Sequence, residues 1–348
     1  MKIRSAISVV ATCLVFIHLT ALASAQEAFY SGKTIIVIAP SNPGGGIDAY
    51  SRLVARHIGR HIQGAPNVLV RNMPGAGGVV ALNHLTSIAP QDGTVILNLN
   101  PGNLIHEAIG APGMKGSLRT LQWLGDLSRD NPVDITYPHS KVKTIQDAQR
   151  MPVRVGATGV GSSPALIAWT YKALLGAQYE VIMGYSGAGE YDLAIQRGEL
   201  DGRSVTSFSS YMAGLPEEIR PKINLLVQLG VEKDPNVPPH VPLLLDLVRG
   251  DPVKEPAARF VSLVLASINR PFAVGPNVPS SRAAILQMAF DDTMRDERFI
   301  FEAKKMGATL APSTGAQVKA VVDEALSFPP EIMTAVMEAL APALGQSK

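Results

Sequence analysis

Short β-branched runs alternate with amphipathic segments along this chain. Segments of helical period lie between the runs, as at 49–63, where Val54, Ile58 and Ile62 share one stripe. Because strands that alternate with helices build parallel βαβ units, the pattern predicts an α/β fold. The runs with the composition of buried strands, bounded by Gly, Pro or Asn, are 34–39, 68–70, 95–99, 153–157, 180–184 and 225–229.

The alternation occurs twice, and each half begins in the same way. A Gly-rich turn joins the first strand of the half to its first helix, at 40–48 and again at 156–164. A repeat of this kind predicts two similar α/β lobes.

The chain should cross between the lobes at 126–138 and at 267–275. The expected first lobe comprises residues 26–128 with 268–348, and the expected second lobe comprises 129–267. About 320 residues after the N-terminal segment suit two domains.

The N-terminal segment, residues 1–25, has the order of a secretory signal peptide. Lys2 and Arg4 precede an apolar run at 6–23, and Ala23 and Ala25 supply a small-x-small cleavage pattern. The alternative is an uncleaved anchor, since about 18 apolar residues can span a bilayer. Four polar residues inside the run argue against an anchor, so we expect cleavage and a periplasmic protein.

Cys13 is the one cysteine of the sequence and lies inside that segment. The mature chain should therefore contain no thiol, which excludes thiol catalysis, disulfides and cysteine-based zinc sites. Cys13 sits in the middle of the apolar run, after Thr12, and not at its end, which argues against a lipoprotein signal.

The charge balance gives no indication of a nucleic-acid partner. Loss of Lys2 and Arg4 lowers the number of basic residues from 31 to 29, equal to the 29 acidic residues. A chain without a basic face lacks the electrostatic footprint of nucleic-acid binding.

The turn at 40–48 places unpaired backbone N–H groups at the start of a helix, where anions bind. Its glycines, including Gly45 and Gly46, let a ligand approach the backbone closely. The alternative is an ordinary tight turn in which Asp48 caps the helix. Asp48 has a second possible role, since its carboxylate can meet the amino group of an amino-acid ligand.

Three further Gly-rich turns follow predicted strands, and each has a purely structural alternative as a strand-to-helix turn, a cap or a packing residue. None has the Gly-x-Gly-x-x-Gly pattern of a dinucleotide site or the lysine of a P-loop. The candidate ligand-binding residues in these turns are Ala76, Gly77, Thr158, Gly159, Ser162, Ser163, Tyr185 and Gly187.

Taken in order, these motifs resemble the solute receptors of tripartite tricarboxylate transporters, the Bug or TctC family. The resemblance covers nearly the whole mature chain and is carried by the turn before Asp48 and by the segments 72–78, 90–94, 158–162, 185–187, 198–201 and 276–279. It implies a type II periplasmic binding protein with two Rossmann-like lobes and a hinge. It further implies that a small carboxylate binds in the cleft and is delivered to membrane transporter subunits.

The resemblance implies that backbone and hydroxyl groups of three turns hold the ligand carboxylate. The residues that it carries over are Ser41, Gly45, Gly46, Thr158, Gly159, Ser162, Ser163, Tyr185 and Gly187. The chain departs from the family at Gly184, where Pro is usual, at the inserted Asn42-Pro43, and over 232–246. Dicarboxylates, aromatic acids and amino acids all remain candidate ligands.

Several residues that resemble catalytic or metal-binding groups have simpler interpretations. His57 and His61 are four residues apart, a spacing that suits a metal, but no third ligand is evident, and a solvated helix face is expected. The paired acids at 291–292 and 296–297 lie among arginines and should be ion-paired at the surface. We therefore expect no metal, no cofactor and no enzymatic activity.

The leading hypothesis is a monomeric transport receptor whose lobes close about the two crossings. A periplasmic sensor subunit that reports the same ligand to a signalling receptor is the alternative. A small-molecule phosphoesterase is a third candidate, for which the sequence offers no convincing nucleophile, base or metal set.

Overall fold

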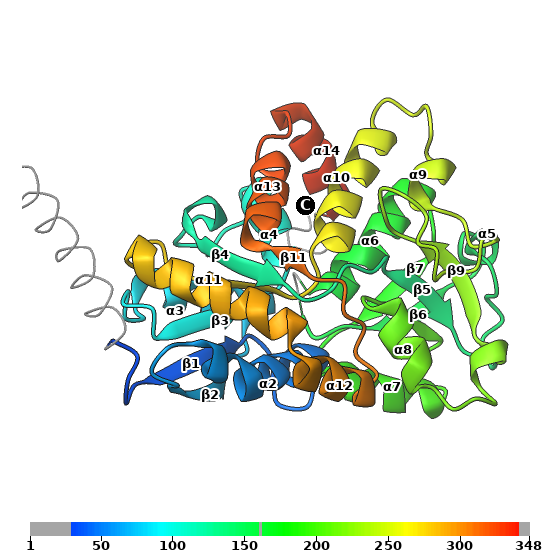
Figure 1. The fold of residues 1–348 in the computed structure, drawn as a ribbon. Coiled ribbons are helices and arrows are strands. Elements are labelled where there is room, and N and C mark those ends of the chain that lie inside the picture. Colours follow the sequence, from blue (N-terminus) through cyan, green and yellow to red (C-terminus); the bar gives the residue numbers. More distant parts are fainter. Residues whose placement is uncertain (1–28, 160–161, 341–348) are drawn as a thin grey trace, which may run out of the picture.

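The computed structural model describes residues 29–159 and 162–340, which form two α/β lobes around two separate sheets (Figure 1). The first lobe contains a six-stranded sheet in the order β11 (Ser313–Thr314), β4 (Gln122–Asp126), β10 (Pro271–Val274), β3 (Val95–Asn98), β1 (Thr34–Ala39) and β2 (Asn67–Asn72). The second lobe contains a five-stranded sheet in the order β7 (Tyr179–Ile182), β6 (Val153–Gly156), β8 (Gly202–Val205), β5 (Val133–Thr136) and β9 (Asn224–Gln228).

The two sheets repeat one plan, apart from the short edge strand β11. In the first lobe β1 lies between β2 and β3 and is parallel to both, as β6 lies between β7 and β8 in the second. Next in order comes an antiparallel strand, β10 in one sheet and β5 in the other, followed by β4 or β9. The sequence repeat therefore corresponds to a structural repeat, and the predicted two-lobed α/β class is confirmed.

Both sheets are mixed, however, whereas the alternation of strands and helices predicted parallel sheets. The difference arises where the chain changes lobes. It leaves the first sheet through β4, enters the second through β5, and returns through β10. Each of these strands pairs with its neighbours in the antiparallel sense, because it is joined to the other lobe and not to the strand beside it through a crossover helix.

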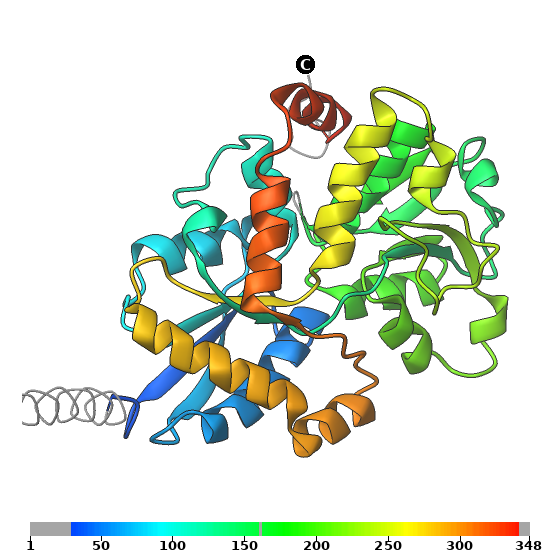
Figure 2. The same ribbon diagram turned by 45° about the horizontal axis from the view of Figure 1, so that its top comes forward.

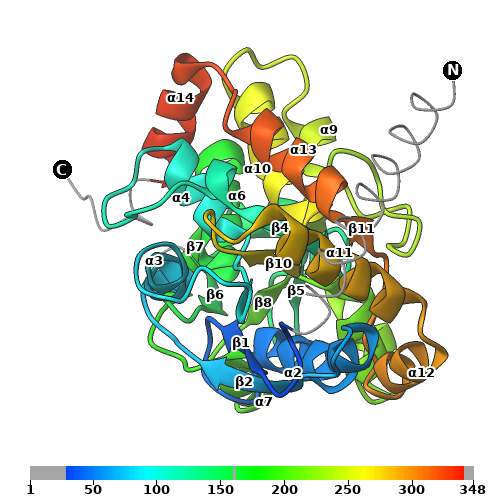
Figure 3. The same ribbon diagram turned by 60° about the vertical axis from the view of Figure 1, so that its left-hand side comes forward.

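Helices cover both sheets (Figures 1 and 3). The first lobe carries α2 (Gly46–Ile58), α3 (Val79–Ser87), α4 (Gly102–Ala108), α11 (Ser280–Arg295), α12 (Glu297–Lys305) and α13 (Gly315–Ala325). The second carries α5 (Ile145–Ala148), α6 (Ser163–Leu175), α7 (Ala188–Gln196), α8 (Phe208–Gly214) and α9 (Leu244–Leu247). Four short 3₁₀ turns are η1 (Gly59–His61), η2 (Ala76–Gly78), η3 (Leu118–Thr120) and η4 (Arg220–Lys222).

Two helices connect the lobes on the side opposite β1 and β2 (Figure 3). α10 (Lys254–Ser267) contacts α6 and α9 of the second lobe as well as α4 and α13 of the first, and it runs beside α13 in Figure 2. α14 (Pro330–Leu340) contacts α6 and α10, although the sequence suggested that the C-terminal helices return to the first lobe. The exact lobe boundaries remain a prediction.

A continuous apolar core underlies this connection. Leu97 of β3, Val155 of β6 and Val264 of α10 are fully buried members of one cluster. Separate clusters lie beneath α2 and α11 and around α7 and α8. Within residues 29–159 and 162–340, no helix is both long enough and apolar enough to cross a bilayer.

Candidate ligand-binding cleft

A cavity of about 600 Å³ lies between the lobes and is lined by turns from both of them. The parallel strands β1, β2 and β3 end at one side of it and β6, β7 and β8 at the other, the edge at which open α/β sheets bind ligands. The structure brings together at this cavity eleven of the twelve residues proposed from the sequence: Ser41, Gly45, Gly46, Ala76, Gly77, Thr158, Gly159, Ser162, Ser163, Tyr185 and Gly187.

Three helices begin at the cavity wall, α2 after Gly45, α6 after Ser162 and α7 after Gly187. In none of them does the N-cap side chain accept a hydrogen bond from the first turn. Each helix therefore has backbone N–H groups without a side-chain cap and the positive end of a helix dipole next to the cavity. Such an arrangement favours an anionic ligand.

The lobes are closed in this structure. The hydroxyl groups of Tyr50 and Ser210 lie 3.2 Å apart across the interface, and Ser163 donates a hydrogen bond to Asn100 at 3.1 Å. At the mouth, a Cβ atom added to Gly187 would lie 3.8 Å from the Cα atom of Gly45. A ligand in the cavity would therefore be held from both sides.

The turn after β2 has an uncommon backbone. Ala76 has φ 45° and Gly77 has φ 64°, both in the left-handed region that few residues other than glycine adopt. Asn100 and Asn103 donate to the carbonyl oxygen of Gly77 and fix this conformation. The Gly-rich turn with the predicted residues Ala76 and Gly77 is thus a part of the cavity wall whose backbone is fixed by hydrogen bonds.

The structure does not place Asp48 on the cavity wall. Its side chain is buried beneath the first turn, where it accepts hydrogen bonds from the Gly44 N–H at 2.9 Å, from Asn72 at 2.8 Å and from Arg52 at 3.0 Å. Burial opposes ionisation, but these donors outweigh it and lower the pKa of Asp48. Asp48 therefore fixes the turn, and the described contacts do not direct its carboxylate to a ligand amino group.

The two serines of the second-lobe turn also have protein partners. Ser162 donates to the Gly159 carbonyl oxygen at 2.8 Å, and Ser163 donates to Asn100. These hydroxyl groups shape the turn and link the lobes. A ligand at this turn would therefore meet other donors, such as the Thr158 hydroxyl and backbone N–H groups.

Sequence reasoning missed the charged residues of the cavity, Asp192, Arg203 of β8 and Arg270 just before β10, and its aromatic residues other than Tyr185. The Arg203 Nη1 donates to both carboxylate oxygens of Asp192, at 2.7 and 2.8 Å, and its guanidinium lies 4.5 Å from the ring centre of Tyr191. Arg270 lies 5.3 Å from the ring centre of Tyr50. No local sequence signal marks either arginine, because each reaches the cavity only through strand order.

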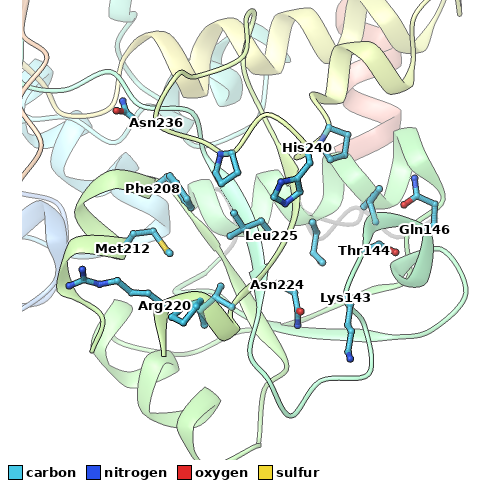
Figure 4. Close-up of a pocket in the computed structure, with 16 residues that line it drawn as sticks. Lys143, Thr144, Gln146, Phe208, Met212, Arg220, Asn224, Leu225, Asn236 and His240 are labelled. Carbon is cyan, nitrogen blue, oxygen red and sulfur yellow. The ribbon is translucent and has the colours of Figure 1, made fainter. Parts of the chain in front are cut away.

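A second cavity, of about 810 Å³, lies on the outer side of the second lobe (Figure 4). Phe208, Met212 and Leu225 give it apolar walls, and Lys143 and His240 are among its polar lining residues. Part of its wall comes from the stretch 232–246, in which the chain departs from the family pattern. The cavity is not lined by any of the residues proposed from the sequence for ligand binding.

The expectation that His57 and His61 form a solvated helix face is wrong. His57 is buried and its Nε2 lies 2.5 Å from a carboxylate oxygen of Glu302, while His61 Nε2 lies 2.9 Å from Asp296. His57 thus joins α2 to α12, and His61 joins η1 to Asp296 just before α12, contacts between distant parts of the chain. Within the described ranges no cluster of three or more His, Cys, Asp or Glu side chains suits a metal ion.

Comparison with known proteins finds similar folds among periplasmic binding proteins. No protein-family model matches the chain. A UPF0065 protein of Bordetella pertussis (strain Tohama I) is 28% identical over 202 residues, which is 55% of this chain and 60% of that protein. The match thus spans less than two thirds of the length of this curated relative.

Solved structures are similar over more of the chain. The periplasmic binding protein BugD has a TM-score of 0.67 at 16% identity, covering 92% of this chain and 100% of BugD. MatC of Rhodopseudomonas palustris with bound malate has a TM-score of 0.66 at 18% identity, covering 87% and 99%. A further R. palustris protein with adipate has a TM-score of 0.63 at 16% identity, covering 90% and 97%. The predicted fold and the predicted resemblance to Bug proteins are confirmed.

Proposed function

We propose that the chain is an exported solute-binding receptor that captures a small organic carboxylate between its lobes and delivers it to a tripartite tricarboxylate-type transporter. The observation that carries the proposal is the convergence of three helix N-termini without side-chain caps, from both lobes, on one closed cavity. Backbone donors fixed in this way bind anions without any rearrangement of side chains.

The structural neighbours support an acid as the ligand, since one of them holds malate and another holds adipate. The residues that line the cavity support a receptor that binds its ligand without converting it chemically. Among the described residues that line the cavity Asp192 is the one carboxylate and no histidine is present, and Asp192 is paired with Arg203.

The proposals that the protein is exported and that it delivers its ligand to a transporter are based on the sequence. Residues 1–25, which have the pattern of a signal peptide, lie outside the described residues, and we propose that the mature protein begins near Gln26 in the periplasm. Intact-mass analysis of periplasmic protein checks this cleavage, and retention of residues 1–25 would contradict it. Delivery to a transporter by a monomeric receptor, as opposed to signalling, is likewise a proposal.

Calorimetry and thermal unfolding with matched acids and amides test the binding proposal. We expect the protein to bind at least one of four acids, namely succinate, adipate, benzoate and glutamate. The neutral amide of that acid should bind far more weakly. A binder present at a hundredfold excess over its Kd should stabilise the protein by about 2.7 kcal/mol. Equal responses to an acid and its amide would refute an anion-binding cleft.

A further inference from the structure

Arg270 is a buried cation at the ligand cavity. It immediately precedes β10, and because β10 is antiparallel to β3, the start of β10 lies at the same sheet edge as the Gly-rich turns. The side chain lines the cavity, and its Nη2 lies 3.4 Å from the position that a Cβ atom of Gly46 would occupy. The guanidinium therefore adjoins the N-terminus of α2.

The charge of Arg270 has no close counter-ion among the described residues. The residue is 8% exposed, and no carboxylate of the described residues lies within 4.0 Å of its guanidinium nitrogens. Nη1 donates to the carbonyl and side-chain oxygens of Asn269, whereas Nε has no acceptor. A buried guanidinium in this state carries a desolvation cost that an entering anion would offset.

The carboxylates whose charges act most on Arg270 are those of Asp126 and Asp130, and neither forms an ion pair with its guanidinium. Asp126 accepts hydrogen bonds from the backbone N–H groups of Asn269 and Arg270, and Asp130 accepts from Ser207 and the Ser209 N–H. Burial raises the pKa of each to about 7, so each is partly protonated near neutral pH. Neither fully neutralises the guanidinium.

Arg203 provides the contrast within the same cavity. Its Nη1 binds both oxygens of Asp192, and its Nη2 donates to the Tyr191 hydroxyl at 3.3 Å. Its charge is therefore already paired with a carboxylate inside the second lobe, although its Nε, like that of Arg270, has no acceptor. Of the two cavity arginines, only Arg270 keeps an uncompensated charge for a ligand.

We propose that Arg270 binds a second carboxylate, so that the ligand is a dicarboxylate held at two separate places. This inference rests on the proposed function, and it places the first carboxylate at the N-terminus of α6 in the second lobe. The N-terminus of α6 lies beside Asn100, which accepts a hydrogen bond from Ser163, whereas Arg270 lies beside Gly46 and Tyr50 of the first lobe. The cavity thus offers positive charge at two positions.

The test compares succinate and adipate with their monomethyl esters, which keep the length and lose one charge. Affinities are measured by calorimetry for the full mature protein, Arg270→Gln, Arg270→Lys and the control Arg71→Gln, whose side chain is exposed on β2. In the unmodified protein at least one diacid should bind about 30-fold or more tightly than its ester. Arg270→Gln should remove that difference by weakening the diacid alone, Arg270→Lys should restore part of it, and Arg71→Gln should preserve it.

Three outcomes would overturn the inference, and they differ in what they say about the proposed function. Equal affinity of diacid and ester, or an equal loss of both in Arg270→Gln, would leave carboxylate capture standing and show that Arg270 does not hold a second group. Failure of both diacids and both esters to bind, if benzoate and glutamate also fail, would remove the proposed function itself. The comparison of acid and ester in the unmodified protein decides the matter even if Arg270→Gln does not fold.

Discussion

Gly45 and Gly187 stand at the start of α2 and α7, where the cavity wall is made of backbone. Neither needs to be glycine for the chain to follow its path. Gly45 has φ −80° and ψ 168°, and Gly187 has φ 172°, both extended conformations open to any residue. The absence of a side chain leaves room for the opposite lobe beside Gly187, and we propose that it leaves room for a ligand beside Gly45.

Gly45→Val tests this role at the level of one residue. A Cβ atom at Gly45 would lie 3.8 Å from the Asn42 carbonyl oxygen, an ordinary contact, so the unliganded fold should tolerate the change. The valine side chain should obstruct the approach of a carboxylate and weaken binding tenfold or more, roughly 1.4 kcal/mol. Calorimetry measures the affinity, and thermal unfolding with circular dichroism measures the fold. Undiminished affinity in a folded variant would place the carboxylate elsewhere.

Among the elements, β5 is notable because a carboxyl group lies inside a fully buried strand. Asp134 is 1% exposed, and Tyr179 and Ser204 lie beside it without completing a hydrogen bond. Burial raises the pKa of Asp134 to about 6. Ionisation of this side chain therefore destabilises the second lobe.

Asp134→Asn should change the pH dependence of unfolding. Between about pH 4, the ordinary pKa of aspartate, and pH 6, the folded state keeps a proton that the unfolded chain releases. The free energy of unfolding should therefore fall as pH rises through this window, by up to about 3 kcal/mol for a shift of two units. Asparagine cannot ionise and should remove that part of the slope, as urea titrations at pH 4, 5, 6 and 7 would measure.

Ligand affinity is the control for Asp134→Asn, because Asp134 does not line the cavity, and it should be unchanged near neutral pH. A slope identical to that of the unmodified protein would show that Asp134 is ionised in the folded state throughout this range.

For the whole molecule, we propose that function depends on closure of two lobes that share a core along α10. Closure brings Gly45 and Gly187 together and joins Tyr50 to Ser210 across the interface. Thr309, in the segment after α12, also accepts a hydrogen bond from Ser210 at 3.0 Å. The closed state is therefore held by small polar contacts and by close backbone approach at the cavity mouth.

Gly187→Val should hold the lobes apart. A Cβ atom there already lies 3.8 Å from Gly45, so the larger branched side chain of valine would meet the first lobe. We expect weaker acid binding and a smaller ligand-induced decrease in the radius of gyration, measured by small-angle X-ray scattering. Gly189→Val is the matched control, since nothing lies within 4 Å of a Cβ atom at that exposed position. Equal acid affinity and an equal decrease in radius of gyration in the two variants would contradict closure of the lobes at Gly187.

Local chain chemistry determined much of the fold and of the candidate site. The six predicted strands coincide with β1, β2, β3, β6, β7 and β9, because apolar β-branched runs between Gly and Pro form buried strands wherever they pack. The Gly-rich turns were predicted as anion sites because a turn between a strand and a helix exposes backbone N–H groups regardless of its distant neighbours.

The tertiary structure decided what depends on distant parts of the chain. β5 and β8 were missed because they carry Asp134 and Arg203, charges that a sequence pattern does not assign to buried strands. Asp48 was turned away from the cavity by Asn72, 24 residues later. The reversed direction of β10 brought Arg270 beside Gly46. Such contacts join residues far apart in sequence, and only the order and direction of the strands fix them.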